Sequence, residues 1–286
     1  MNCNSESSFT TQWCPGCGNF VTLECLKSAL CNLQIEARDY VIASGIGQAA
    51  KLGFSLQCNL LAGLHGRALP LAMGLKMANH QLKVLAVSGD GCFYAEGGNH
   101  LLHTARRNLD VTMLASDNRV YGLTKGQASP TAAADFTTKI HPEGVGAQPL
   151  EPTLIALSAG ATFVAKAFTG NPGELTTLIE KAIQHPGFAL IDILSPCVSF
   201  NKVNTFAWFK KRIQTIDDNH DRNNLAAALQ LAQFDPETLI PTGIYYQADK
   251  PVYGSNKKAM QGKPISFRTP SYKPERVRPL FAHYQS

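Results

Sequence analysis

Short apolar runs alternate along this chain with stretches in which apolar residues recur every three or four positions. The runs at 39–44, 83–88, 110–116 and 188–194 have the length of buried strands, and each leads into glycine or polar residues. Helical spacing occupies much of the remaining chain, at 18–34, 64–79, 96–107, 153–159 and 173–185. This alternation predicts an α/β fold with a doubly wound, mainly parallel sheet.

The composition changes near residue 200, which predicts a division into residues 1–200 and 201–286. The first part carries the strand–helix alternation. In the second part we expect helices at 205–215 and 222–234, a strand at 240–246 and an extended polar tail that contacts a neighbouring subunit.

Composition narrows the class of protein. Charged residues make up only 16% of the chain, which favours a surface partly covered by another subunit. The net charge of +5 comes without a cluster of Lys and Arg interleaved with aromatic residues, so a nucleic-acid partner is not expected. The chain has no apolar run of membrane-spanning length, and residues 1–11 lack the apolar core of a signal peptide, so we expect a cytoplasmic protein. In that reducing compartment, most of the eight cysteines should be free, metal-binding or catalytic.

Asp90 and Asn118 follow two of the predicted strands directly. The carboxyl ends of neighbouring parallel strands meet at one edge of a sheet, where such folds bind ligands. Carboxylate and amide oxygens suit Mg²⁺, which takes its remaining ligands from a diphosphate and water. Gly89 and Gly91 flank the aspartate and allow the backbone to approach that diphosphate closely. The simpler alternative for Asp90 is a turn or helix-cap residue.

The spacing resembles the thiamine diphosphate motif, in which Gly-Asp-Gly is followed by an asparagine at the next strand end. Three further segments, at 13–18, 65–68 and 121–127, together with residues 99–100 and 195–197, are similar to the β subunits of 2-oxoacid:ferredoxin oxidoreductases, most of all the 2-oxoglutarate type. The resemblance implies that residues 1–200 form the domain that holds the diphosphate of the cofactor. It further implies oxidative decarboxylation of a 2-oxoacid to an acyl-coenzyme A, with electrons passing through an iron–sulfur cluster to ferredoxin. A partner α subunit would supply the glutamate that activates the cofactor.

The resemblance assigns roles to particular residues. Asp90, Asn118 and the carbonyl group of Val120 would bind Mg²⁺. The cofactor would be contacted by Ile46, Gly47, Gln48, Ala49, His65, Gly91, Cys92, Gly122 and Leu123. Cys92 stands where an acidic residue is more usual, although its backbone N–H can still serve a phosphate.

Lys125 lies in the predicted loop at 123–150, which is long enough to be an active-site loop. In similar subunits a lysine here implies a substrate with a second, distal carboxylate, and an ammonium group is a suitable point charge for it. This residue is the main reason to expect 2-oxoglutarate rather than pyruvate. The alternative is a solvated surface lysine.

Cys14 and Cys17 form a Cys-x-x-Cys motif, which by itself is ambiguous between zinc, a redox pair and an iron–sulfur site. The resemblance implies a [4Fe–4S] cluster on these two residues, on Cys197 and on a fourth cysteine at the position of Gln48. Three accounts remain open. The cluster persists with a non-cysteine ligand, Cys58 replaces the missing ligand, or the cluster is lost or replaced by zinc. Cys25 and Cys31 lie in a helical stretch and are expected to be buried apolar residues.

Other classes of function explain less of the chain. Residues 45–50 read Gly-x-Gly-x-x-Ala after a strand, as in nucleotide-binding folds, but the acidic residue needed about 20 positions later for a ribose is missing. Other thiamine diphosphate enzymes, such as decarboxylases and carboligases, carry both cofactor domains in a longer chain. A catalytically degenerate subunit that only binds a partner remains an alternative because of Gln48.

Overall fold

The computed structural model describes residue 7 and residues 9–269 and 273–282. Its main feature is an eight-stranded sheet in the order β2-β1-β3-β4-β8-β7-β10-β9. The strands are β1 (Tyr40–Ser44), β2 (Asn59–Ala62), β3 (Lys83–Gly89), β4 (Thr112–Asp117), β7 (Phe163–Phe168), β8 (Ala189–Leu194), β9 (Ile213–Thr215) and β10 (Ile240–Gln247). Within this sheet, as far as the described residues go, β10 and β7 are the one antiparallel pair of neighbours. The expected mainly parallel α/β fold is confirmed.

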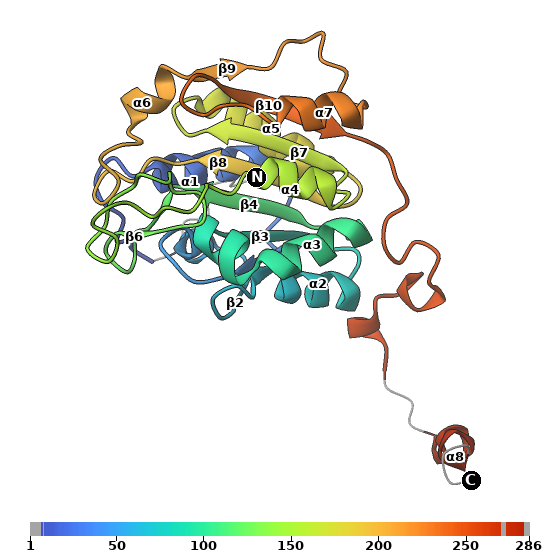
Figure 1. The fold of residues 1–286 in the computed structure, drawn as a ribbon. Coiled ribbons are helices and arrows are strands. Elements are labelled where there is room, and N and C mark those ends of the chain that lie inside the picture. Colours follow the sequence, from blue (N-terminus) through green and yellow to red (C-terminus); the bar gives the residue numbers. More distant parts are fainter. Residues whose placement is uncertain (1–6, 8, 270–272, 283–286) are drawn as a thin grey trace.

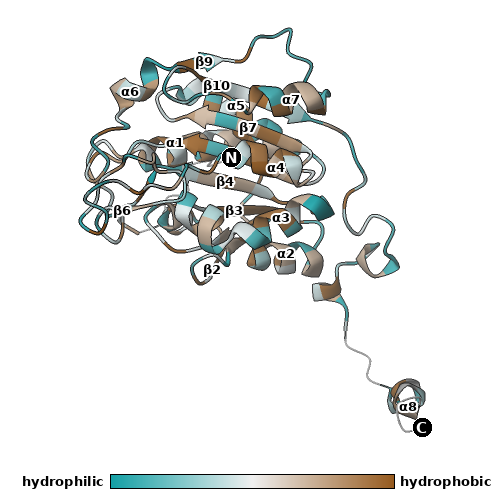
Figure 2. Cartoon of the chain, in the orientation of Figure 1, coloured by the Kyte–Doolittle hydropathy of each residue, from teal (hydrophilic) through white to brown (hydrophobic). Residues whose placement is uncertain are grey.

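Helices cover both faces of the sheet, which produces the layered arrangement in Figure 1. On one face lie α1 (Gly18–Asn32) and α5 (Pro172–Gln184), and on the other lie α2 (Ala68–Ala78), α3 (Gly98–Arg107), α4 (Pro152–Ser158) and α7 (Leu225–Leu231). Successive residues of each strand point to opposite faces, so Leu85 packs with the first group and Val84 with the second. Because both faces are covered, the central strands are mostly apolar, and they are tan to brown over much of their length in Figure 2, with a teal segment in β7.

The helix expected at 205–215 is wrong in its second half. Helix α6 (Phe206–Lys210) ends early, and Ile213–Thr215 forms the edge strand β9. Strand β9 pairs in parallel with β10, with Ile213 opposite Ile240. The backbone hydrogen bonds and the packing available at the edge of β10 outweigh the local preference of so short a segment.

The C-terminal segment leaves the sheet after Gln247 and runs away from it in Figure 1. It is not simply extended, because it contains η3 (Lys258–Met260), η4 (Ile265–Phe267) and α8 (Pro274–Ala282). Ile265, Phe267 and Phe281 are exposed along it. The predicted division at residue 200 stays a prediction. No helix in the described part of the chain has the length and apolar character needed to cross a membrane.

Candidate active site

The predicted metal ligands lie at the carboxyl ends of two central strands. Strands β3 and β4 pair in parallel with Gly89 opposite Ser116, so Asp90 and Asn118 leave the sheet at the same edge. Asp90 is buried and begins a single π-helical turn, η2 (Gly91–Glu96). Turns of this kind are rare and frequently occur at functional sites.

Two side chains shape the turn after β4. Asp117 Oδ1 accepts a hydrogen bond from the N–H of Arg119 at 3.1 Å, and Asn118 Oδ1 accepts one from the N–H of Val120 at 3.0 Å. Arg119 takes a left-handed conformation with φ of 58°. Its guanidinium carbon lies 5.2 Å from the ring centroid of Trp208, a cation–π contact that holds this unusual residue in place. The turn leads into β5 (Val120–Tyr121), which pairs with β6 (Gln127–Ala128).

Thr131 joins the two buried carboxyl groups of the site. Its Oγ1 lies 2.9 Å from Asp90 Oδ2 and 2.7 Å from Asp117 Oδ1. Burial raises the pKa of Asp90, and burial together with the Asp192 and Asp90 carboxylates raises the pKa of Asp117 well above its usual range. Adjacent buried carboxyl groups of this kind fit a divalent cation, whose charge would favour their ionised forms.

A buried ion pair supports these strand ends from within the sheet. Lys166 on β7 contacts Asp192 on β8, and its Nζ also lies 3.2 Å from Glu151 Oε1. Tyr94 donates a hydrogen bond to Asp192 Oδ1 at 2.8 Å. Burial by itself would lower the pKa of Lys166, but the Asp192 and Glu151 carboxylates outweigh it and raise that pKa. Sequence analysis missed this network, although a lysine and an aspartate inside apolar strand runs were a signal for it.

The glycines of the site allow close backbone packing. A Cβ atom at Gly91 would lie 2.0 Å from the ring of Tyr121, and one at Gly45 would lie 2.3 Å from Cys92 Sγ. The thiol of Cys92 accepts a hydrogen bond from the N–H of Gly66 at 3.2 Å. Cys92 therefore ties the η2 turn to the segment before α2 and lies close to the turn after β1.

His65 lies beside η2 and the β5 strand. Its Nδ1 is 3.1 Å from Glu96 Oε2, and Tyr121 donates a hydrogen bond to the same oxygen at 3.3 Å. The histidine therefore has one charged neighbour on its Nδ1 side, while the ring is still partly exposed. Of the other predicted cofactor contacts, Ile46 and Leu123 are 41% and 44% exposed, so both side chains are accessible to a ligand or a partner.

The remaining predicted cofactor contacts line the same edge. Gly47 adopts φ of 121°, a conformation that strongly favours glycine, with open space where a Cβ would be. Ala49 is buried at the start of η1 (Ala49–Ser55). Gly122 and Lys125 lie in the turn between β5 and β6, where the N–H of Lys125 bonds the Gly122 carbonyl group at 3.2 Å. Lys125 is exposed and has φ of 70°.

The three cysteines of the predicted cluster line one small pocket of about 50 Å³. Cys14 and Cys17 come from the N-terminal segment and Cys197 from the turn after β8, and Gln48, Asn118 and Gly122 line the same pocket. Burial, followed by the nearby Cys197 and Cys14 thiols, raises the pKa of Cys17. Gln48 Oε1 is buried without a hydrogen-bond partner, while the Gln48 carbonyl oxygen accepts from Trp13 Nε1 at 2.8 Å. Gln48 thus lines the same pocket as the three thiols and has a buried side-chain oxygen without a hydrogen-bond partner.

Other cysteines behave differently from one another. Cys25 is buried, as expected, and Cys58 is a free thiol that packs against the core beside α1. Cys58 does not line the pocket of Cys14, Cys17 and Cys197. Cys31 is partly exposed and disulfide-bonded, contrary to the expectation of a buried free thiol. Among the described residues, no three His, Cys, Asp or Glu side chains converge on a position for a single metal ion.

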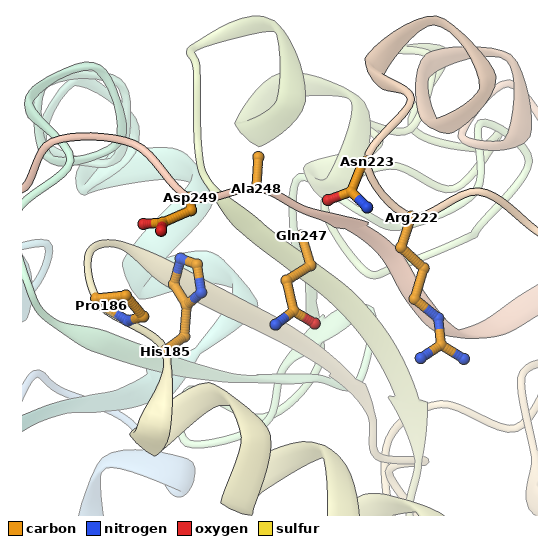
Figure 3. Close-up of a pocket in the computed structure, with 7 residues that line it drawn as sticks. All are labelled: His185, Pro186, Arg222, Asn223, Gln247, Ala248 and Asp249. Carbon is orange, nitrogen blue, oxygen red and sulfur yellow. The ribbon is translucent and has the colours of Figure 1, made fainter.

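A larger pocket of about 420 Å³ lies away from this edge. Its lining comes from the turn before β8 and from the end of β10, which pairs with the amino end of β7. Figure 3 shows His185 and Asp249 at one end of it and Arg222 at the other. Parallel sheets bind ligands outside the carboxyl ends of their strands, so this pocket is not the candidate active site.

Comparison with known proteins agrees with this geometry. Residues 45–193 match the C-terminal binding domain of thiamine pyrophosphate enzymes, and residues 197–261 match the C-terminal part of the pyruvate ferredoxin oxidoreductase β subunit. A β subunit of 2-oxoacid:ferredoxin oxidoreductase 2 from Aeropyrum pernix is 37% identical over 82% of this chain and 79% of that protein. The chain belongs to this family of oxidoreductase β subunits. The expected family and the expected thiamine diphosphate domain are thereby confirmed.

Two further matches are to proteins named for 2-oxoglutarate. The KorB subunit of a 2-oxoglutarate oxidoreductase from Mycobacterium tuberculosis is 43% identical over 66% of this chain and 51% of that protein. The solved 2-oxoglutarate:ferredoxin oxidoreductase of Magnetococcus marinus, with 2-oxoglutarate, coenzyme A and succinyl-CoA bound, superposes with a TM-score of 0.89. Its sequence is 35% identical, and the match covers 96% of this chain and 94% of that one.

Proposed function

We propose that this β subunit forms, with an α subunit, an enzyme that converts 2-oxoglutarate and coenzyme A to an acyl-coenzyme A and passes the electrons to ferredoxin. The observation that carries the proposal is the meeting of Asp90 and Asn118 at the ends of β3 and β4, in a family of 2-oxoacid oxidoreductases. When bound, thiamine diphosphate supplies the electron sink that allows a 2-oxoacid to lose CO₂.

The metal site would be built from Asp90, the Asn118 side chain and the Val120 carbonyl group. The buried Asp90 carboxylate and the amide oxygen are hard ligands that fit Mg²⁺. In this proposal they position the diphosphate, while the exposed apolar side chains of Ile46 and Leu123 face the cofactor and the α subunit. The chain thereby fixes the cofactor and excludes water around it.

Lys125 would select the substrate. It is exposed in the turn between β5 and β6, which also carries Gly122 and Leu123 of the proposed cofactor contacts. Its ammonium group can pair with the distal carboxylate of 2-oxoglutarate, which pyruvate lacks.

We propose an iron–sulfur cluster on Cys14, Cys17 and Cys197, with the Gln48 carboxamide in the place of a fourth thiolate. The support is that Gln48 and the three thiols line the same pocket, and that Gln48 Oε1 is buried without a hydrogen-bond partner. The residues fit three of the four thiolates of a [4Fe–4S] cluster. The amide oxygen is a harder and weaker ligand for iron–sulfur clusters, so the iron at that corner would exchange readily.

Iron content and EPR spectra of the anaerobically purified complex test the cluster. In the wild type we expect a cluster signal in the EPR spectrum. In the Gln48→Cys variant we expect about four irons per αβ unit and a cluster that resists oxygen better than that of the wild type. A wild-type complex without iron, combined with a Gln48→Cys variant that binds it, would mean that this chain has lost the cluster. Electrons would then need another route, and this chain would be better explained as a subunit of a non-redox enzyme or as a catalytically degenerate subunit.

The proposed partners follow from the same assignment. An α subunit would contribute the activating glutamate and cover the exposed side chains of the site, and the segment after Gln247 would contact it through Ile265 and Phe267. The proposed location is the cytoplasm, where free thiols such as those of Cys14 and Cys197 persist.

The whole proposal is tested by ferredoxin reduction in the co-expressed αβ complex. We expect activity that requires 2-oxoglutarate, coenzyme A, Mg²⁺ and thiamine diphosphate, and that is lost in Asp90→Ala. The matched control is Asp218→Ala, which removes a fully exposed carboxylate and should retain activity. Unchanged cofactor-dependent activity in Asp90→Ala would overturn the metal assignment.

A further inference from the structure

Thr131 lies in the loop between β6 and α4 and contacts the proposed metal-binding carboxylate of Asp90, as the hydroxyl of Ser129 in the same loop also does. The Thr131 side chain is 3% exposed, and its hydroxyl lies within hydrogen-bonding distance of both Asp90 Oδ2 and Asp117 Oδ1. Ser129 Oγ lies 3.2 Å from the same hydroxyl. Three polar groups from three segments of the chain therefore converge on one threonine.

A hydroxyl group has a single hydrogen to donate, so Thr131 can donate to only one of the two carboxylates at a time. When it donates to Asp90 Oδ2, the other oxygen of Asp90 remains for a cation. Loss of the hydroxyl would remove one hydrogen-bond donor from the two buried carboxylates, while Asp117 Oδ1 would keep the N–H of Arg119 as a donor. The Thr131 hydroxyl therefore helps to determine which oxygen of Asp90 remains available for a cation.

The same loop also packs on the second metal-binding segment. Ala132 and Phe136 form a small buried cluster with Val120, and Cys197 packs against this cluster. The loop is closed on itself by a hydrogen bond from the N–H of Leu150 to the Pro130 carbonyl group at 2.9 Å. Residues 129–150 thus touch the aspartate through a hydroxyl group and Val120 through apolar contacts.

We propose that Thr131 is a positioning residue that orients Asp90 for the metal and couples the order of residues 129–150 to occupation of the metal–diphosphate site. The coupling is reciprocal, because a loop that favours the binding-competent carboxylate is itself stabilised when the metal binds. The inference rests on the proposed function, since it takes Asp90 as a ligand of the metal.

The test compares Thr131→Val, which keeps the shape and removes the hydroxyl, with Thr131→Ser, which keeps the hydroxyl. Calorimetry of the αβ complex at saturating thiamine diphosphate gives the dissociation constant for Mg²⁺. We expect this constant to rise about 10- to 100-fold in Thr131→Val and to change less than about threefold in Thr131→Ser. The control is Thr162→Val, which removes a buried hydroxyl bonded to Asn108 Oδ1 at 2.6 Å, at the other edge of the sheet. It should lower the Tm and leave the Mg²⁺ constant unchanged.

Hydrogen exchange provides a readout independent of activity. In the wild type and in Thr131→Ser, addition of Mg²⁺ and thiamine diphosphate should slow exchange of amides in 132–146, and in Thr131→Val this slowing should be lost. Wild-type Mg²⁺ affinity in Thr131→Val, or equal weakening in Thr131→Ser and Thr162→Val, would overturn the inference. If the Thr131→Val variant does not assemble with the α subunit, the wild type alone still tests the inference. Hydrogen exchange in 132–146 that does not change when the metal binds would overturn it. A wild-type complex that binds no Mg²⁺ would instead refute the proposed function.

Discussion

Lys166 and Asp192 form an ion pair across neighbouring strands in which the two residues are 2% and 0% exposed. The pair lies in the centre of the sheet and is extended by Tyr94 and Glu151. Two charges removed from water in this way are stable only when each keeps its partner. The ends of β4 and β8, and with them the turn that carries Asn118, therefore depend on a charge pair rather than on apolar packing alone.

Removal of one charge should be costly for stability. We expect Lys166→Met to lower the free energy of unfolding by about 3–5 kcal/mol, because Asp192 would remain buried and uncompensated. Urea unfolding followed by circular dichroism measures this difference. Arg38→Met breaks an exposed pair with Glu36, side chains 79% and 45% exposed, and should cost less than about 1 kcal/mol. The double variant Lys166→Met/Asp192→Leu should recover part of the loss, and equal effects of Lys166→Met and Arg38→Met would contradict this view of the pair.

Gly91 should tolerate no side chain. A Cβ there would lie 2.0 Å from the Tyr121 ring, so Gly91→Ala must displace either that ring or the backbone beside Asp90, at a cost of about 1–3 kcal/mol. We expect a clear loss of thiamine diphosphate affinity, measured by titration calorimetry. Gly98→Ala is the control, because nothing lies within 4 Å of its Cβ position in α3. Partial rescue of Gly91→Ala by Tyr121→Leu would identify the ring as the cause, and normal affinity in Gly91→Ala would show that the close approach is not needed.

Lys125→Ala should change the choice of substrate more than the chemistry. Loss of a charge-assisted contact of about 1.5–3 kcal/mol corresponds to a fall of about 10- to 100-fold in kcat/KM for 2-oxoglutarate. The value for pyruvate should change little, since pyruvate has no distal carboxylate. Steady-state kinetics with both substrates measures the ratio, and Lys139→Ala, an exposed lysine in the loop at 123–150, is the control. If the ratio of kcat/KM for 2-oxoglutarate to that for pyruvate is unaltered in Lys125→Ala, Lys125 does not select the substrate.

His185 should make stability depend on pH in the acidic range. It is buried at the end of α5, its Nε2 lies 2.8 Å from Thr162 Oγ1, and burial lowers its pKa from the ordinary value of 6.5. The unfolded chain therefore binds a proton more readily, so the free energy of unfolding should fall as the pH drops below 6.5 and should recover as the pH rises through that window. Urea titrations between about pH 5 and 8 measure the slope. His185→Gln should flatten it, and an identical slope in that variant would assign the effect to other groups.

Part of the site was predictable because it depends on local patterns. The apolar runs that end at Gly89 and Ser116 specify buried parallel strands, and parallel strands bring the residues that follow them to one edge. Asp90 and Asn118 could therefore be placed together from their positions alone. A close approach of the backbone at Gly91 could also be predicted from the sequence, but the packing of the Tyr121 ring against it could not.

The α/β class, the edge of the sheet that carries the polar residues and the family of the chain all follow from local sequence patterns. The contact between Thr131 and Asp90, 41 positions earlier, and the pairing of Lys166 with Asp192 are visible only in the folded chain. The same holds for Ile213–Thr215, which becomes a strand rather than a helix. The physical reason is the same in each case. Periodicity records which residues are buried, whereas partners distant in the sequence are selected by strand order, loop closure and the need of buried polar groups for a partner.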